Sequence, residues 1–170
     1  MAREKNPFIE YKLSHFNTKT IKRALSKNDI LKIINADCTN QGKLRQLTHD
    51  LFSFSYLCGG ISFVDIANLT RQNIVEDRLI YQRQKTHGNI NLLLSKEAST
   101  IIAKYSTYQQ EAEYLFPILH CKRHITPMQK SNRVHKICHQ VNTELRAFAK
   151  ELGITAEVTT YTAKHHTISI

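Results

Sequence analysis

Glycine and proline are scarce in this chain, whose 170 residues include only 5 Gly and 3 Pro. This scarcity excludes a collagen-like or low-complexity polymer. No apolar run approaches the roughly 18 residues of a membrane span, and no apolar segment follows the polar N-terminus as in a signal peptide. The four cysteines are widely spaced, which favours reduced thiols over a disulfide framework. These absences predict a cytoplasmic protein.

Acidic residues are missing from residues 114–143, and the whole chain has a net charge of +10, from 24 Lys and Arg against 14 Asp and Glu. A surface of one sign attracts polyanions, so the charge favours duplex nucleic acid as partner. A basic surface that only keeps the protein soluble is the alternative, and a membrane-surface helix is not indicated. The basic residues concentrate in two stretches: Lys19, Lys22, Arg23, Lys27 and Lys32, and then Lys122, Arg123, Lys130, Arg133 and Lys136.

Helix signals dominate the pattern along the chain. Residues 1–24 are polar and predict an arm or linker, so the folded domain is expected to span residues 25–170. Capping-box patterns at Ser26 and Ser62 predict helix starts, a further helix is expected over residues 41–56, and Gly59-Gly60 ends it. Ser95 predicts the start of a helix that runs to about residue 108.

The middle of the chain has a different periodicity. Residues 78–85 and 89–94 are strand-like, and Thr86-His87-Gly88 joins them, so we expect a β-hairpin. An apolar stripe from about residue 132 to 152 predicts a long amphipathic helix capped by Gly153. A last helix is expected after Thr159 or Thr160. The predicted fold class is mainly α with a small β-hairpin (α+β).

Three motifs follow one another in an informative order. They occupy residues 54–69 (with Gly-Gly-Ile-Ser-Phe-Val-Asp-Ile), residues 81–86 and residues 159–165 (Thr-Thr-Tyr-Thr-Ala-Lys-His). In this order they resemble the catalytic domain of tyrosine recombinases (phage-type integrases), in particular the mobile-element type of Bacteroides-like bacteria, over residues 20–168. The resemblance implies that duplex DNA is cleaved and rejoined through a 3′-phosphotyrosine, without metal or nucleotide cofactor.

The resemblance also implies roles for single residues. Lys85 matches the general-acid lysine of the hairpin, which gives a proton to the leaving 5′-oxygen. Asp65 matches the acidic residue of the first arginine motif, and His165 the histidine that follows the second arginine. Tyr161 stands at a histidine position where the family accepts tyrosine. Arg83, on the hairpin, is a further candidate DNA contact.

Departures from the family pattern bear on the chemistry. Ser62 stands where the first family arginine usually falls, and Gly59 holds the position three residues earlier that the Bacteroides type uses. Arg71 is a candidate substitute. Lys164 replaces the second arginine and loses its bidentate fork. The chain is expected to end before the nucleophilic tyrosine, so we expect no covalent DNA intermediate, and a monomer in isolation, although other recombinase protomers are possible partners on DNA.

Two other constellations are less well supported. Cys121-x2-His124 with His135-x3-His139 imitates the spacing of zinc ligands, but the histidines also extend the basic surface, so no metal is predicted. A Ser62–Asp65–His87 triad lacks a nucleophile elbow, and a capping box explains the first two residues. The favoured function is a DNA-binding recombinase catalytic-domain fragment. The alternatives are a non-catalytic DNA-binding relic or regulator and a zinc-stabilised interaction domain.

Overall fold

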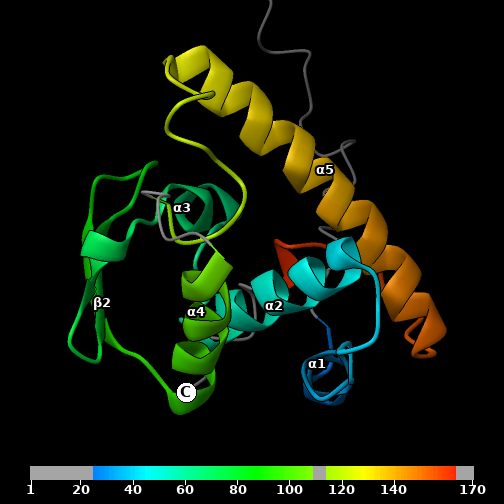
Figure 1. Ribbon diagram of the computed structural model, residues 1–170. Coiled ribbons are helices and arrows are strands. Elements are labelled where there is room, and N and C mark those ends of the chain that lie inside the picture. The colour runs from blue at the N-terminus through cyan, green and yellow to red at the C-terminus, as the bar shows by residue number, and fades with distance from the viewer. Residues whose placement is uncertain (1–24, 109–113, 164–170) are drawn as a thin grey trace, which may run out of the picture.

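The computed structural model describes residues 25–108 and 114–163, which form a mainly helical fold with one small antiparallel sheet (Figure 1). This is the predicted fold class. The elements in chain order are α1 (Lys27–Ile34), α2 (Lys43–Leu57), α3 (Phe63–Asn68), the 3-10 helix η2 (Arg71–Asn73), β1 (Ile74–Val75), β2 (Arg78–Gln82), β3 (Asn89–Leu93), α4 (Lys96–Tyr108) and α5 (Pro127–Glu151). The predicted arm over residues 1–24 lies outside the described residues.

Serine caps begin three of the helices, as the sequence predicts. The hydroxyl oxygens of Ser26 and Ser62 accept hydrogen bonds from the backbone N–H three residues later, at the starts of α1 and α3. The Ser95 hydroxyl does the same for Ala98 at the start of α4. Each bond satisfies a backbone donor that the first helical turn leaves unpaired.

Helix α5 begins at Pro127, five residues before the predicted start at residue 132. Thr126 and Gln129 form a reciprocal capping box there, in which each side chain accepts a hydrogen bond from the other's backbone N–H. The prediction relied on the apolar stripe, and the first turn of α5 is polar and therefore invisible to that criterion. The helix ends as expected, since Gly153 has a φ of +72°.

The sheet has three strands in the order β1-β2-β3. The predicted hairpin is present as β2 and β3, whereas β1 was not predicted from the sequence. Strand β1 is only two residues long and pairs with the start of β2 through Ile74 and Leu79. Strand β2 ends at Gln82 rather than at residue 85, which places Gln84 and Lys85 in the turn. Leu79 and Tyr81 point into the core from β2.

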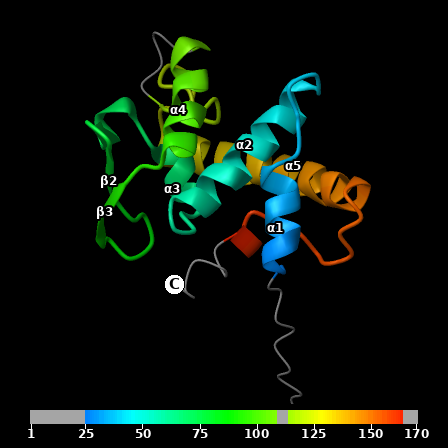
Figure 2. The same cartoon turned by 90° about the horizontal axis from the view of Figure 1, so that it is seen from below.

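Two apolar clusters form the core on either side of α2. One packs the inner face of the sheet against α3, α4 and the first half of α5, and Phe54 of α2 is fully buried in it. The other packs α1 against the second half of α5 and includes Phe52 of α2. Figure 2 shows the sheet and α1 on opposite sides of α2. Helix α2 therefore joins the two halves of the molecule.

The segment after α5 returns to the core instead of leaving it. Ile154, Val158 and Ala163 are buried in the second cluster. The backbone N–H of Thr162 donates to the Thr159 carbonyl, which closes a single turn where a last helix was expected. The rest of that expected helix, from residue 164 onward, lies outside the described residues. No helix in the described part of the chain is long and apolar enough to cross a membrane.

Candidate nucleic-acid interface

A cleft of about 530 Å³ opens between α3, the β2–β3 turn and the first half of α5. Its walls combine apolar side chains with hydroxyl, amide, imidazole and amine groups. They are Phe63, Val64 and Asn68 from α3, Gln84 from the turn, Ile125 from the loop before α5, and Pro127, Lys130, Ser131, Val134, His135 and Cys138 from the first half of α5. The first two sequence motifs thus meet here, each contributing part of a wall.

The carboxylate of Asp65 links α3 to the β2–β3 turn. One oxygen accepts a hydrogen bond from the Ser62 hydroxyl at 2.7 Å, and the other accepts from the backbone N–H of Gln84 at 2.8 Å. Asp65 is only 7 % exposed. Sequence reasoning anticipated an orienting role for Asp65 but not its partner, because nothing in the pattern connects residues 65 and 84.

The β2–β3 turn presents Lys85 to solvent at the end of this link. The Arg83 carbonyl accepts from the backbone N–H of His87, and the Gly88 carbonyl accepts from the N–H of Arg83, both at 2.9 Å. His87 has a φ of +54°, which completes the tight reversal. The catalytic role implied for Lys85 stays a prediction. The side chain stands on a short turn that is held by its own backbone hydrogen bonds.

Arg83, the first residue after β2, lies beside the phenol of Tyr81 in that strand. Burial raises the pKa of Tyr81, the nearby Asp65 carboxylate raises it further, and the hydrogen bond from Arg83 opposes the shift. The tyrosine is therefore neutral at physiological pH. It packs in the core beneath the turn and serves as structural support.

No cation occupies the two positions that the resemblance assigns to the first arginine. Ser62 is the N-cap of α3, and its hydroxyl donates to Asp65. Gly59 has a φ of +73° and ends α2. The candidate substitute Arg71 donates to the Ser106 carbonyl at 2.7 Å, which directs its guanidinium toward the end of α4.

The second basic stretch divides among several surfaces. Lys130 lines the cleft and lies over the ring of Tyr114, with its amine 5.7 Å from the centroid. Arg133 donates to the Ile118 carbonyl at 3.1 Å. Lys136 is exposed, and at about 100° of rotation per residue it lies about 140° around α5 from the cleft-lining Ser131.

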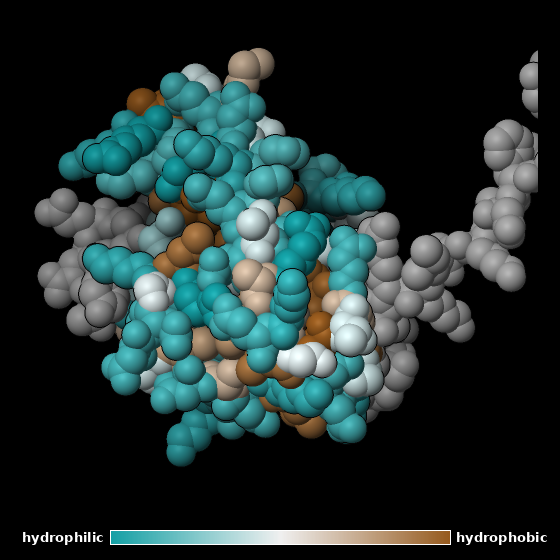
Figure 3. All heavy atoms as spheres, turned by 90° about the vertical axis from the view of Figure 1, so that its right-hand side faces the viewer, coloured by the Kyte–Doolittle hydropathy of each residue, from teal (hydrophilic) through white to brown (hydrophobic). Residues whose placement is uncertain are grey.

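The remaining predicted contacts also fall into separate places. Lys122 and Arg123 are exposed in the loop before α5, and Lys27 is exposed at the start of α1, beside the second cluster. The side of the molecule on which α5 lies is predominantly hydrophilic (Figure 3). Lys19, Lys22, Arg23, Lys164 and His165 lie outside the described residues.

The third motif reaches the cleft through α5. The backbone N–H of Thr160 donates to the Asn142 side chain at 2.8 Å, and the Thr160 hydroxyl lies 3.8 Å from the Cys138 sulfur, which lines the cleft. Tyr161 comes next in the chain and is 59 % exposed. The first two sequence motifs therefore line the cleft, and the third motif contacts α5, the helix that forms the opposite wall.

Metal-binding geometry is not present at these residues. Within residues 25–108 and 114–163, no three His, Cys, Asp or Glu side chains are grouped as a metal site requires. His124, from the zinc-like pattern, and the neighbouring His120 each use Nδ1 to accept a backbone hydrogen bond.

Comparison with known proteins gives a likeness of structure only. No family model and no curated protein matches the chain. Among solved structures, XerA recombinase, a lambda integrase dimer bound to a COC′ core site and the lambda integrase catalytic core each align with a TM-score of 0.55 and 16 % identity over 85 % of this chain. The aligned part spans 48 %, 39 % and 80 % of those chains, respectively. This chain therefore spans about half the length of XerA recombinase. The chain has the fold of a tyrosine-recombinase catalytic domain.

Proposed function

We propose that this protein binds duplex DNA as the catalytic-domain part of a tyrosine recombinase, with the phosphate backbone lying along the cleft between the β2–β3 turn and α5. The observation that carries the proposal is that the first two motifs meet at one cleft, whose opposite wall, α5, is contacted by the third motif. The fold likeness and the net charge of +10 support it. Such a protein would work on DNA in the cytoplasm, together with other recombinase protomers.

Lys85 and Lys130 have separate tasks in this proposal. The Lys85 ammonium would donate its proton to the 5′-oxygen that leaves the scissile phosphate, while a tyrosine oxygen forms the new bond to phosphorus. Asp65 would hold the turn so that this lysine meets the phosphate from a fixed support. Lys130, across the cleft, would neutralise phosphate charge.

A second candidate function is DNA binding without strand cleavage. One observation favours it: the positions of the first family arginine hold Ser62 and Gly59, and the serine hydroxyl is already engaged by Asp65. Phosphoryl transfer needs positive donors on the phosphate oxygens, and an arginine fork supplies two at once. Loss of that fork should therefore lower the rate of strand cleavage much more than the affinity for DNA.

The salt dependence of DNA binding tests the shared part of both candidates. Fluorescence anisotropy with a labelled duplex, measured at several salt concentrations, gives the number of phosphates contacted, because log K falls with log salt by about 0.9 per contact. We expect the Lys85→Gln and Lys130→Gln double variant to lower that slope by about two. Lys150→Gln, at the far end of α5, is the matched control and should retain the wild-type slope. An unchanged slope in the double variant contradicts the proposed interface.

Strand cleavage separates the two candidates. In a full-length protein that carries the nucleophilic tyrosine, a nicked suicide duplex traps the covalent protein–DNA product of a tyrosine recombinase, which survives denaturing electrophoresis. A trapped complex that disappears in Lys85→Ala supports the recombinase and removes the non-catalytic candidate. DNA binding with the expected salt slope but without any trapped complex supports the binding module.

A further inference from the structure

The loop that leads into α5 is held together by side-chain acceptors. The backbone N–H of Lys122 donates to Nδ1 of His120 at 3.1 Å, and the N–H of His120 donates to Nδ1 of His124 at 2.9 Å. Gln129 continues the pattern, since its amide oxygen accepts from the N–H groups of Ile125 and Thr126. The His120 carbonyl also accepts from the N–H groups of Arg123 at 3.1 Å and His124 at 2.9 Å. Residues 120–126 are thus held by imidazole, amide and backbone acceptors together.

This loop forms part of the cleft wall. Ile125 lines the cleft and is 71 % exposed, and the loop also carries the exposed cations Lys122 and Arg123. The half-buried Cys121 packs against the first core cluster, so one side of the loop is anchored. The two histidine hydrogen bonds and the capping box at the start of α5, together with the backbone bonds to the His120 carbonyl, therefore orient the basic side chains.

Each histidine can fill its place only as a neutral imidazole. An Nδ1 atom that accepts a hydrogen bond carries no proton, whereas in the imidazolium both ring nitrogens are donors. Protonation of His120 or His124 would set an N–H against a backbone N–H and break the bond. These two hydrogen bonds, and the loop conformation that they support, are therefore sensitive to acid.

The groups whose charges act on His124 are all basic. Burial and the charges of Arg133 on α5 and of His120 and Arg123 in the loop lower the pKa of His124. A group with a lowered pKa in the folded protein stabilises the fold fully above its usual pKa of about 6.5, and this contribution is lost as the pH falls through the folded value. The loop should accordingly be closed at pH 7.5 and loosen in moderately acidic solution.

We propose that His120 and His124 are positioning residues that hold the basic loop beside the cleft in its DNA-binding form, and that protonation of His124 releases this loop. The inference rests on the proposed DNA-binding function and names a pH-dependent control of that same site. It contrasts with simple electrostatics, in which added imidazolium charge strengthens binding to a polyanion.

Asparagine provides a matched variant for the test. Its Oδ1 stands at the same distance along the side chain as Nδ1 of histidine, accepts a hydrogen bond and does not titrate. In the full chain, hydrogen-exchange protection of the His120 and Lys122 amides is measured by NMR at pH 7.5 and 5.5, corrected for the intrinsic exchange rate. We expect wild-type protection to fall several-fold at pH 5.5 and the His120→Asn/His124→Asn variant to keep it. His124→Leu, which removes one acceptor, should show low protection of residue 120 at both pH values.

DNA binding is then compared over the same pH range, with the same anisotropy assay. We expect wild-type affinity to fall at least threefold relative to the double asparagine variant between pH 7.5 and 5.5. Equal protection of the wild-type loop at both pH values overturns the inference, and so does an equal pH response of the two proteins in DNA binding. A protein that binds no DNA at either pH, with a loop that still opens in acid, contradicts the proposed function instead.

Discussion

Removal of the Asp65 carboxylate should release the β2–β3 turn from α3. In Asp65→Ala the backbone N–H of Gln84 loses its 2.8 Å acceptor, and the Ser62 hydroxyl loses its own at 2.7 Å. A polar group that loses its partner in a partly buried place costs about 1–3 kcal/mol, and we expect about 1–2 kcal/mol because the turn itself reaches solvent. For a domain of this size that corresponds to a fall in Tm of about 2–8 °C.

The decisive readout is the salt slope of DNA binding. Freed from α3, Lys85 should no longer hold a fixed phosphate contact, so Asp65→Ala should lower the slope by about one. Two controls accompany it. Ser62→Ala loses a helix cap, at a cost of about 1 kcal/mol, but leaves the Gln84 bond intact and should keep the wild-type slope. Asp65→Asn retains an oxygen acceptor for Gln84 and should also keep it. A wild-type slope in Asp65→Ala, alongside a lowered slope in Lys85→Gln, refutes the idea that Asp65 positions the turn.

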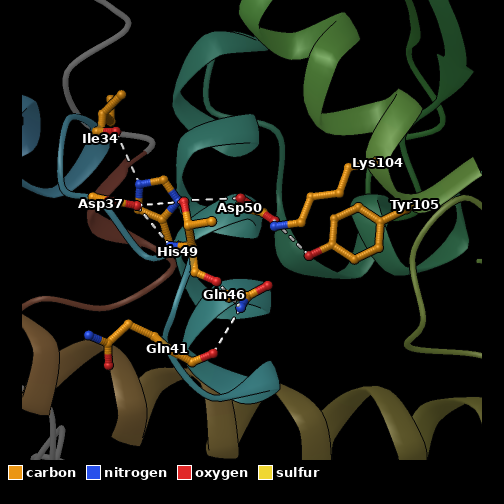
Figure 4. A network of polar contacts seen from close by, with 9 residues as sticks. Ile34, Asp37, Gln41, Gln46, His49, Asp50, Lys104 and Tyr105 are labelled. Carbon is orange, nitrogen blue, oxygen red and sulfur yellow. Dashed lines mark hydrogen bonds and ion pairs between the residues drawn. The ribbon is translucent and has the colours of Figure 1, made fainter.

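Three further predictions concern the fold. Arg45→Leu should lower the free energy of unfolding by about 1–3 kcal/mol in urea titrations. The reason is that the guanidinium binds two carboxylates of α5 and stacks on an α5 ring 4.8 Å away. An unchanged urea midpoint would mean that apolar packing alone stabilises the α2–α5 contact. Burial alone would raise the pKa of Asp50, but three hydrogen bonds hold that pKa below its usual value (Figure 4). The carboxylate therefore stabilises the fold above about pH 4, and this contribution is lost in acid. In Asp50→Asn the free energy of unfolding should depend less on pH in the acid range. Burial raises the pKa of Cys58 to about 12, so iodoacetamide at pH 8 should modify Cys121 in the native protein and Cys58 only after unfolding, as mass spectrometry can show.

Local chemistry explains why so much of the fold was predictable. Ser26, Ser62 and Ser95 begin helices by bonds to residues three positions away, and a cap of this kind is visible in any short window of sequence. Strand β1 was missed because two residues carry no periodicity, and they form a strand only because β2 offers a partner. The early start of α5 was missed because the stripe of apolar residues begins a turn later.

The site was less predictable than the fold because its contacts are not local. The bond from Gln84 to Asp65 spans 19 positions, and the one from Thr160 to Asn142 spans 18. Basic residues of one stretch were expected to share a surface, yet Lys130 lines the cleft while Lys136 lies far around the helix. Charge counts give the sign of the partner, and helix rotation then decides which of those charges can reach it.

Binding and chemistry place different demands on this cleft, so each needs its own measurement. Affinity for DNA depends on the number of cations near phosphates, and lysines at positions 85 and 130 satisfy that demand as well as arginines. Transition-state stabilisation depends on fixed donors, and the loss of one typically costs 10²–10³ in rate. Any cleavage would therefore require a cation to replace the one missing at Ser62. Arg71 is the nearest in sequence, and its bond to the Ser106 carbonyl would have to break before it could do so. A cleavage-competent protein should for this reason lose activity in Arg71→Lys, whereas a pure DNA-binding module should bind equally well with either residue.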